Sequence, residues 1–433
     1  MTEIVCCARA LVRGVVRMDY AFVVQDDHII AAGDFSSIRP SYPQHSKRSF
    51  GPASLVVPGF VNGHSHAYQI LLRGWADDLP FERWRSEALY RVIPRLSADD
   101  VYWVFVAAFG EMLAAGITTV AEFFYLNGAG NAHAEAAIRA SADSGIRLVF
   151  ARTWMDAPDA PPAFRESIDQ ALARTQALRE QFPDTMICPA PHSLHAASPT
   201  MIREAASFAR AYSLPMHIHV AEAAYEGERT VAECGSTPVH LLARLDALFS
   251  GSVLVHAIYV AEDEKDAIAQ ASASVIHNPM TNQYLGDGIC DVVGYRRRGV
   301  AVGLGTDANV NPSIFEEMRS AALLQKVKTC DASVMQAANA FALGTWDGAA
   351  ALHVRAGDLQ AGSFADYCVL DSTNIDVWSP AVNALVHRAN GSWVRNTFVA
   401  GREVQRFAQV SDLMRDAHAA LVQIAQMLDL PPA

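Results

Sequence analysis

The feature that most constrains the fold is an alternation, between residues 55 and 307, of short apolar runs with amphipathic segments. Eight runs have the length and residue types of buried strands: LVVPGFVN, ITTVAEFFY, IRLVFART, MICPAPH, LPMHIHV, SVLVHA, ASVIHNP and VAVGLGTD. Between them, segments such as TMIREAASFARAYS repeat apolar residues at a helical period. Alternating strands and helices predict a parallel sheet, and eight such units predict an α/β fold with a distorted (β/α)8 TIM barrel.

The segments on either side of the predicted barrel follow another pattern. Residues 1–57 and 355–407 contain short runs such as AFVVQ, HIIAAG and ADYCVLDS, separated by polar turns. We predict that these two segments form one small composite β-sandwich domain and that the barrel, residues 58–354, is inserted between them. Residues 408–433 are predicted to be an amphipathic helix followed by a tail.

Composition narrows the class of partner. A formal net charge of −12 disfavours nucleic acid and anionic membranes. Seven cysteines without regular spacing argue against a disulfide framework and suit a reducing compartment. The chain shows no signal-peptide pattern and no uncharged apolar stretch of roughly 18 residues. We therefore expect a cytoplasmic protein that acts on a small molecule.

Two pairs of histidines stand at the ends of apolar runs. His64 and His66 follow PGFVNG, and His217 and His219 lie in LPMHIHV. Because residues i and i+2 of a strand point to the same side, each pair can turn two imidazoles toward one ion. A single such pair is more often two unrelated polar histidines. In the second pair we favour His219 as the ligand, and expect His217 to lie one layer deeper, bonded to a neighbouring carbonyl.

Three more polar residues stand at the same ends of the predicted strands. His256 ends SVLVH, Asp307 ends VAVGLGTD, and Glu222 follows His219 by three residues. One polar residue at a strand end is common, so each alone says little. Together they fall after the first, fifth, sixth and eighth strands, at the rim where the catalytic groups of a barrel collect. The pattern predicts a metal site with a free carboxylate beside it.

At this point the sequence resembles the amidohydrolase superfamily, in its deaminase branch with one metal ion. PGFVNGHSH, HIHVAE, LVHA and GLGTD carry the resemblance, and GSFADYCVLD and VRNTFVAGREV extend it over nearly the whole chain. It implies that His64, His66, His219 and Asp307 bind the ion and that His256 is not a ligand. The oligomeric state stays open, although members of this family are often homodimers.

The resemblance also implies roles in proton transfer. Asp307 would accept a proton from the attacking water, and Glu222 would carry protons to the substrate nitrogen and the leaving group. His256 would stabilise the tetrahedral oxygen or the attacking hydroxide.

The lysines decide between one metal ion and two. Some relatives bridge two ions with a carbamylated lysine at the end of strand 4, which here reads MICPAPHS. The chain has four lysines, and none ends a predicted barrel strand: Lys47, Lys265, Lys326 and Lys328. We predict a single divalent ion, zinc before iron or manganese, because the ligands are three imidazoles and one carboxylate.

Two narrower resemblances suggest different substrates. LLRGWADDLP and HNPMTN resemble deaminases of adenosyl compounds, triazines and other N-heterocycles. HSHAYQ, ERWRSEALYR, APHSLHAASP and YLGDGI resemble formimidoylglutamate deiminase. The second resemblance implies that Gln69, Arg85 and Tyr125 contact the substrate, with Arg85 binding a carboxylate. A solvated helix arginine is an equally good interpretation of Arg85.

The chain departs from the deiminase pattern at two places. His195 stands where that enzyme carries an arginine, and Ala308-Asn309 follows the metal-binding aspartate. These departures put recognition of two carboxylates in doubt. We expect His195 and Asn309 to face the substrate. Trp75, in the long connection after the first barrel strand, could stack on a ring or pack the connection down.

We therefore predict a zinc-dependent hydrolytic deaminase or deiminase. Its substrate would be a formimino or guanidino acid, or a heterocycle such as a purine, pterin or triazine. The alternatives are a hydrolase of a cyclic amide or a chloro-heterocycle, and a silent ligand-binding relative. The sequence has no GxSxG nucleophile turn, no Gly-rich dinucleotide turn after the first barrel strand and no closed set of cysteine ligands.

Overall fold

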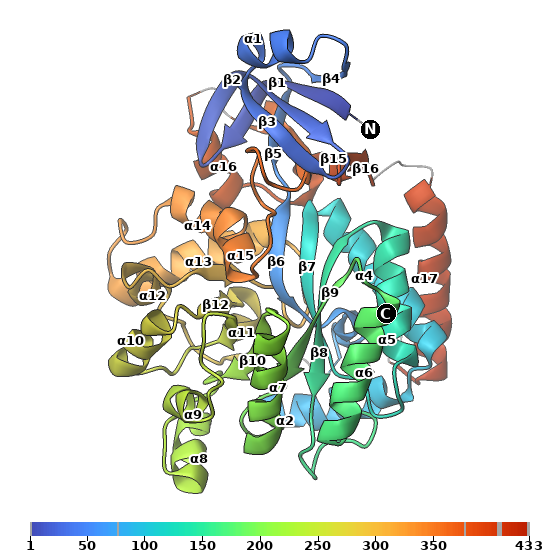
Figure 1. Cartoon of the computed structure of the whole chain (residues 1–433), viewed down its shortest axis with the longest axis vertical. Helices are drawn as coiled ribbons and strands as arrows, with labels where there is room; N and C mark the ends of the chain where they lie inside the picture. Colours follow the sequence, from blue (N-terminus) through green and yellow to red (C-terminus); the bar gives the residue numbers. More distant parts are fainter. Residues whose placement is uncertain (1, 76–77, 376–377, 405–408, 431–433) are drawn as a thin grey trace.

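The structure is a computed structural model that describes residues 2–75, 78–375, 378–404 and 409–430. It has two parts, a barrel with surrounding helices and a smaller sheet at one end (Figure 1). In the barrel, eight parallel strands follow one another in the chain. They are β6 (Phe60–Ser65), β7 (Ile117–Phe124), β8 (Arg147–Trp154), β9 (Met186–Pro191), β10 (Met216–Val220), β11 (Ser252–His256), β12 (Ser274–His277) and β13 (Val302–Leu304).

The strands form two four-stranded sheets, β6–β9 and β10–β13, which meet at both edges. Parallel bridges join Ser193 to His219 and Ser65 to Asp307. The second junction is held by backbone bonds from the amides of Thr306 and Asp307 to the carbonyl of His64, at 3.0 and 2.9 Å. The barrel predicted from eight apolar runs is confirmed, with each run contributing one barrel strand.

The first apolar run also supplies a strand outside the barrel. LVVPGFVN divides at Gly59 between β5 (Ser54–Pro58), in the smaller sheet, and β6 in the barrel. A Cβ on Gly59 would lie 2.1 Å from Oγ1 of Thr118, so a larger residue does not fit at this crossing. Both halves are buried, so the run has the composition of one continuous apolar strand.

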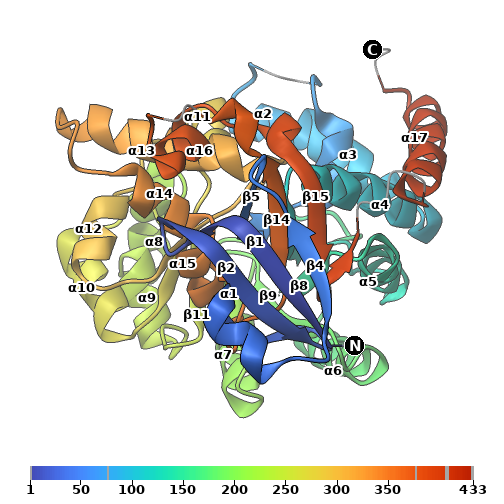
Figure 2. The same cartoon turned by 90° about the horizontal axis from the view of Figure 1, so that it is seen from above.

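Helices surround the barrel and cover its outer face (Figures 1 and 2). Several begin at serine caps: Ser97 and Asp100 form a capping box on α4, and Ser167 and Gln170 form one on α6. The longer helices are α4 (Ala98–Ala114), α5 (Ala132–Ser144), α6 (Ile168–Gln181), α7 (Pro199–Ala211), α8 (Ala224–Cys234), α10 (Glu262–Gln270) and α13 (Ile314–Thr329). Shorter ones are α9 (Pro238–Arg244), α11 (Pro279–Leu285), α12 (Val292–Arg297), α14 (Ala337–Leu343), α15 (Trp346–Ala351) and α16 (Ala381–His387).

The smaller sheet joins strands from both ends of the chain. Its strands are β1 (Thr2–Val12), β2 (Val15–Gln25), β3 (His28–Asp34), β4 (Ser46–Phe50), β5, β14 (Tyr367–Asp371), β15 (Val394–Val399) and β16 (Arg402–Glu403). β1 pairs in parallel with β4 through residues 3–7 and with β5 at Ala10, so the sheet forks there. In its core, the rings of Phe22 and Tyr367 make an edge contact, with 5.2 Å between their centroids. The ring of Phe398 stacks on that of Tyr367, with 4.4 Å between their centroids.

The terminal helix α17 (Gln409–Met427) packs beside α4 (Figure 1). Gly110 of α4 permits this approach, because a Cβ there would lie 2.0 Å from Sδ of Met414. Arg95 donates to the carbonyls of Met427 and Leu428 at 3.0 and 3.2 Å. The boundary that we predicted between residues 407 and 408 lies outside the described residues.

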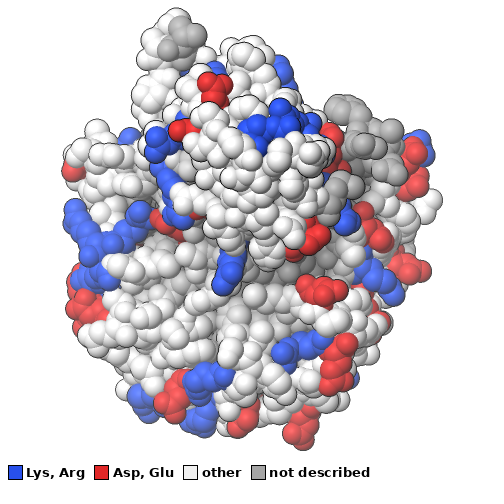
Figure 3. All heavy atoms as spheres, turned by 45° about the horizontal axis from the view of Figure 1, so that its top comes forward, with Lys and Arg blue, Asp and Glu red and all other residues white. Residues whose placement is uncertain are grey.

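Two observations concern the outer surface. On the face drawn in Figure 3, basic and acidic side chains are interspersed in small groups of either sign. Over the described ranges, no helix combines the length and the apolar character needed to cross a bilayer.

Candidate metal centre and substrate cavity

The polar residues predicted at the strand ends meet at one end of the barrel. His64 lies on β6, His219 on β10 and His256 at the end of β11. His66 and Asp307 lie just beyond β6 and β13, and the amide of His66 donates to the carbonyl of Asp307 at 2.8 Å. Parallel strands bring their carboxyl ends to one rim, which explains how residues separated by up to 243 positions become neighbours.

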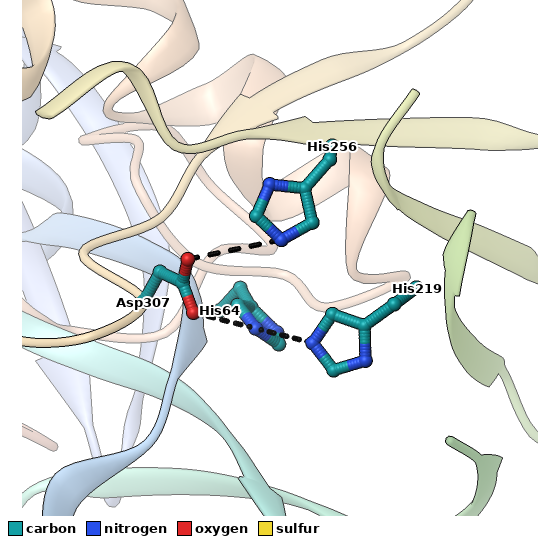
Figure 4. Close-up of side chains that lie close together, drawn as sticks. All are labelled: His64, His219, His256 and Asp307. Atoms are coloured by element: carbon teal, nitrogen blue, oxygen red, sulfur yellow. Dashed lines mark hydrogen bonds and ion pairs between the residues drawn. The ribbon is translucent and has the colours of Figure 1, made fainter. Parts of the chain in front are cut away.

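Asp307 lies at the centre of the cluster. Its Oδ1 is 3.3 Å from Nε2 of His64 and 3.5 Å from Nε2 of His66, and its Oδ2 is 3.7 Å from Nε2 of His256. Nε2 of His219 lies 3.1 Å from Nε2 of His64. In Figure 4 the side chains of His64, His219, His256 and Asp307 point toward one another, and one ligand atom from each of these four falls within 4.8 Å of the others.

Backbone carbonyls fix the tautomers of two histidines. Nδ1 of His66 lies 2.8 Å from the carbonyl of Phe123, and Nδ1 of His219 lies 2.9 Å from the carbonyl of His192. A carbonyl oxygen accepts but never donates, so each Nδ1 carries the proton and each Nε2 keeps a free lone pair. Both Nε2 atoms face the cluster, as the ligands of a metal ion must.

His256 has the opposite arrangement. Its Nδ1 lies 3.0 Å from Nδ2 of Asn282, which also lies 3.3 Å from Oδ2 of Asp287. The Asp287 carboxylate can only accept a hydrogen bond, so the atom of the Asn282 amide that faces it is the nitrogen. The same nitrogen faces His256, and Nδ1 of His256 is therefore an acceptor. The proton of His256 therefore lies on Nε2, which is 3.5 Å from Oε1 of Glu222. This histidine is set up as a hydrogen-bond donor.

Burial sets the charge states that a metal centre needs. It lowers the pKa of His64, His66 and His219, so these imidazoles are neutral and can bind a cation. Three neutral imidazoles and one carboxylate are a donor set that suits a divalent transition metal. The residues present therefore fit a metal ion.

Glu222 stands beside this cluster and lines the cavity above it. Burial raises its pKa well above the usual range, and the nearby charges of Asp287 and Asp307 raise it further. A carboxyl group that holds a proton near neutral pH can deliver that proton to a substrate.

A cavity opens over the centre and contains four of the predicted substrate contacts. Gln69, Arg85, Tyr125 and His195 all line it. Nε2 of Gln69 donates to the Tyr125 hydroxyl at 3.1 Å, which holds both side chains in place. Burial lowers the pKa of His195 to about 4, so it is a neutral donor or acceptor at neutral pH.

Arg85 is held between aromatic rings at the start of a π-helical turn, η3 (Arg85–Leu89). Its guanidinium carbon lies 5.9 Å from the ring centroid of Phe81 and 5.5 Å from that of Tyr90. Nε of Arg85 is buried without a hydrogen-bond partner among the described residues. A buried donor without a partner is available to an acceptor on a bound molecule.

Two expected substrate contacts, Trp75 and Asn309, lie outside the cavity lining. Trp75 is partly buried against the core, with the guanidinium of Arg91 5.6 Å from its ring centroid, so it packs the connection down. Asn309 is fully buried: its Nδ2 donates to Oγ of Ser65 at 3.0 Å, and its Oδ1 accepts from Thr306 at 2.7 Å. Asn309 therefore departs from the sequence prediction, whereas Trp75 follows the second of its two interpretations.

His217 is a further correction. It is fully buried, as expected, but neither ring nitrogen has a hydrogen-bond partner among the described residues. Burial lowers its pKa to about 3, so the ring stays neutral in its apolar surroundings.

Sequence reasoning missed three residues of the site: His192, Asn282 and Asp287. His192 lines the cavity and orients His219 through its carbonyl, and its place at the end of the β9 run could have indicated it. Asn282 and Asp287 belong to HNPMTN and YLGDGI, which we had quoted only for a resemblance. Asn282 joins His256 to Asp287 through hydrogen bonds between segments 26 residues apart, which no spacing rule predicts.

Comparison with known proteins places these features in a family. The sequence pattern of the Amidohydrolase family matches residues 55–404. The chain is 32% identical to the 5-methylthioadenosine/S-adenosylhomocysteine deaminase of Nitratidesulfovibrio vulgaris, over 88% of this chain and 87% of that one. It is 30% identical to the 5'-deoxyadenosine deaminase of Methanothermobacter thermautotrophicus, over 84% of both chains.

Solved structures show the same fold. An adenosine deaminase from Xanthomonas campestris with bound zinc superposes with a TM-score of 0.89, at 26% identity and over 98% of both chains. The zinc complex of an atrazine chlorohydrolase from Arthrobacter aurescens superposes with a TM-score of 0.88 over 97% of this chain and all of that one. Its 21% identity supports the fold alone.

Proposed function

This chain belongs to the amidohydrolase family and is a hydrolase of carbon–nitrogen bonds, and on that premise we propose that it is a zinc-dependent deaminase. It would release ammonia from an amidine-type carbon, one bonded to two nitrogens, in a small nitrogen-rich molecule. The observation that carries this proposal is the placement of Glu222 and His256 beside a cluster of three histidines and Asp307.

His64, His66, His219 and Asp307 would hold one zinc ion. The free Nε2 lone pairs of His66 and His219 support this set over one that includes His256. A single ion is supported by the positions of the four lysines, which lie on β4, α10 and α13, away from the barrel strands. Zinc would supply Lewis-acid activation of a water molecule at neutral pH.

The protein's own residues would handle the protons. Asp307 would take a proton from the attacking water. Glu222, protonated near neutral pH, would give its proton to the substrate nitrogen; it would then carry one of the two water protons to the leaving amino group, which departs as ammonia, and keep the other. The Nε2–H of His256 would donate to the oxygen that develops negative charge at the reacting carbon.

The cavity residues would orient the substrate. The paired Gln69 and Tyr125 present an amide and a hydroxyl, and His195 presents a neutral imidazole. Arg85 would bind an acidic group of the substrate with its unpartnered guanidinium edge. The named relatives act on adenosine compounds, which supports a nitrogen-rich substrate without fixing its class.

The experiment that tests the proposal is an ammonia-release screen of the zinc-loaded protein. The compounds should include formimino and guanidino acids, purine nucleosides, pterins and aminotriazines. Chloride release from a chlorotriazine and ring opening of a cyclic amide are measured in parallel. Ammonia from at least one amidine-type compound supports deamination, whereas chloride or ring-opened product without ammonia overturns it.

A further inference from the structure

Asp287 occupies a rigid turn above the metal centre. The turn follows α11, with Gly286 and Gly288 on either side at φ +74° and +133°. The amide of Asp287 donates to the carbonyl of Asn282 at 3.0 Å, and its carbonyl accepts from the hydroxyl of Tyr259. These two hydrogen bonds fix the backbone of Asp287 on either side of its Cα atom. The carboxylate is therefore presented from a fixed backbone, as a side chain that recognises a substrate must be.

The carboxylate of Asp287 lines the same cavity as Glu222 and is 9% exposed. The hydrogen bond that the structure shows to it comes from Nδ2 of Asn282. In the part of the chain that the structure describes, it forms no ion pair with a lysine or arginine. A nearly buried carboxylate without a cationic partner costs free energy unless a bound molecule compensates it.

The inner end of the cavity, at the metal centre, is lined by acidic residues. Glu222, Asp287 and Asp307 gather at the metal centre, close enough for the charge of Asp287 to raise the pKa of Glu222. The outer connections carry both signs: Arg85 follows α2 (Phe81–Trp84) and Arg229 lies on α8, paired with Glu233, while Glu82 and Asp159 also line the cavity. The inner end therefore favours hydrogen-bond donors and positive charge.

On the premise of the deaminase function, we propose that Asp287 is a specificity-determining carboxylate that accepts an N–H from the substrate. The N–H belongs to the nitrogen that is bonded to the reacting carbon and does not leave. The preferred class is then an amidine or guanidine unit with a donor edge, either open or built into a ring. A 6-aminopurine lacks this edge, because the ring nitrogen beside its reacting carbon is an acceptor.

Asn282 supports the accepting state of Asp287. Burial raises the pKa of Asp287 to about 7, and the hydrogen bond that Nδ2 of Asn282 donates to its Oδ2 acts against this shift by stabilising the ionised form. A protonated Asp287 would instead donate to an acceptor such as the ring nitrogen beside the reacting carbon of a 6-aminopurine. That arrangement would reverse the substrate preference, so the two states predict opposite results in one assay.

The assay compares ammonia release from matched pairs that differ in the donor. The pairs are isocytosine with 2-aminopyrimidine, guanosine with 2-aminopurine riboside, and N-methylacetamidine with N,N-dimethylacetamidine. Adenosine is the reference. We expect kcat/KM for the donor member of at least one pair to exceed that of its partner and of adenosine by roughly 10- to 100-fold, the range of a hydrogen bond to a charged group.

Three variants assign that preference to Asp287. Asp287→Asn can still accept from Asn282 but loses the charge, and Asp287→Ala loses both. Asp291→Asn is the matched control, because Asp291 lies outside the cavity lining and caps α12 in a manner that asparagine can preserve. In Asp287→Asn we expect KM for the donor member to rise about tenfold or more, with little change for its partner.

Binding by zinc-loaded Glu222→Gln, measured calorimetrically with the same pairs, separates this inference from the proposed function. If no compound releases ammonia, the deaminase proposal fails. The contact between Asp287 and the substrate N–H is still supported if the donor member of a pair binds more tightly and Asp287→Asn abolishes that difference. The inference is overturned if kcat/KM for the members that lack the N–H donor equals or exceeds that of their partners. It is also overturned by a donor preference that survives in Asp287→Asn, even if deamination itself is observed.

Discussion

Nε2 of His256 lies 3.5 Å from Oε1 of Glu222, so an imidazole and a carboxyl group face each other across the floor of the cavity. Asn282 accounts for the direction of this contact, because its amide donates to Nδ1 of His256 and leaves the proton on Nε2. Two groups that can each hold a proton thus stand beside the predicted metal ligands. Their roles can be separated by substitution.

Glu222→Gln should keep the metal while ammonia release falls by about 10²-fold or more, since glutamine fills the space but cannot transfer a proton. The measurement is kcat for the best substrate together with zinc content. Asp263→Asn is a control, because Asp263 is exposed and does not line the cavity. Turnover close to that of the wild type would exclude Glu222 as the proton carrier.

His66 and His256 should respond differently to substitution. His66→Ala removes an Nε2 lone pair that faces the centre, so zinc affinity should fall by about 10²-fold or more. His256→Ala removes a donor, so zinc affinity should change little while ammonia release falls by about 10²-fold. Competition with a chromogenic chelator measures the affinities. A larger loss of zinc in His256→Ala would assign this histidine to the metal instead.

Arg85→Met should raise KM for a substrate with a carboxylate by about tenfold, since it removes a cavity-lining guanidinium whose Nε has no hydrogen-bond partner among the described residues. Arg83→Met is the matched control two residues away, because Arg83 is exposed and pairs with Glu87 on the helix surface at 2.7 Å. The measurement is KM for the carboxylate substrate in both variants, from steady-state kinetics. Equal KM values in the two variants would mean that Arg85 is an ordinary helix arginine.

The buried carboxyl group of Glu122 should make the free energy of unfolding depend on pH. It is fully buried on β7, both its oxygens lie 3.0 Å from the amide of Ala67, and burial raises its pKa from 4.5 to about 8. Between those pH values the folded state holds a proton that the unfolded state has lost, so the free energy of unfolding falls as pH rises from about 4.5 to about 8.

Glu122→Gln lacks this titration, so relative to the wild type it should gain at least about 1 kcal/mol in stability at pH 8 compared with pH 5. Denaturant unfolding of both zinc-loaded proteins at the two pH values measures the difference. A constant difference across this range would show that Glu122 does not titrate in the folded state.

The sequence predicted the fold and the strand-end residues because both follow from local rules. Apolar runs with helical segments between them indicated the barrel, and parallel strands bring His64, His219 and Asp307 to one rim. The family prediction is confirmed by the match over residues 55–404. The rest depends on packing between distant segments. Asn309 bonds to Ser65 instead of facing the cavity, Trp75 packs against Arg91, and Asp287 reaches the cavity through the turn after α11.

The most direct test of the central claim is ammonia release by metal-free protein titrated with zinc, using the best substrate from the screen. With one site formed by His64, His66, His219 and Asp307, activity should be absent without metal, rise linearly and saturate at about one equivalent. Asp307→Asn should stay inactive throughout the titration. Full activity in the metal-free protein, or saturation at two equivalents, would contradict a single catalytic ion.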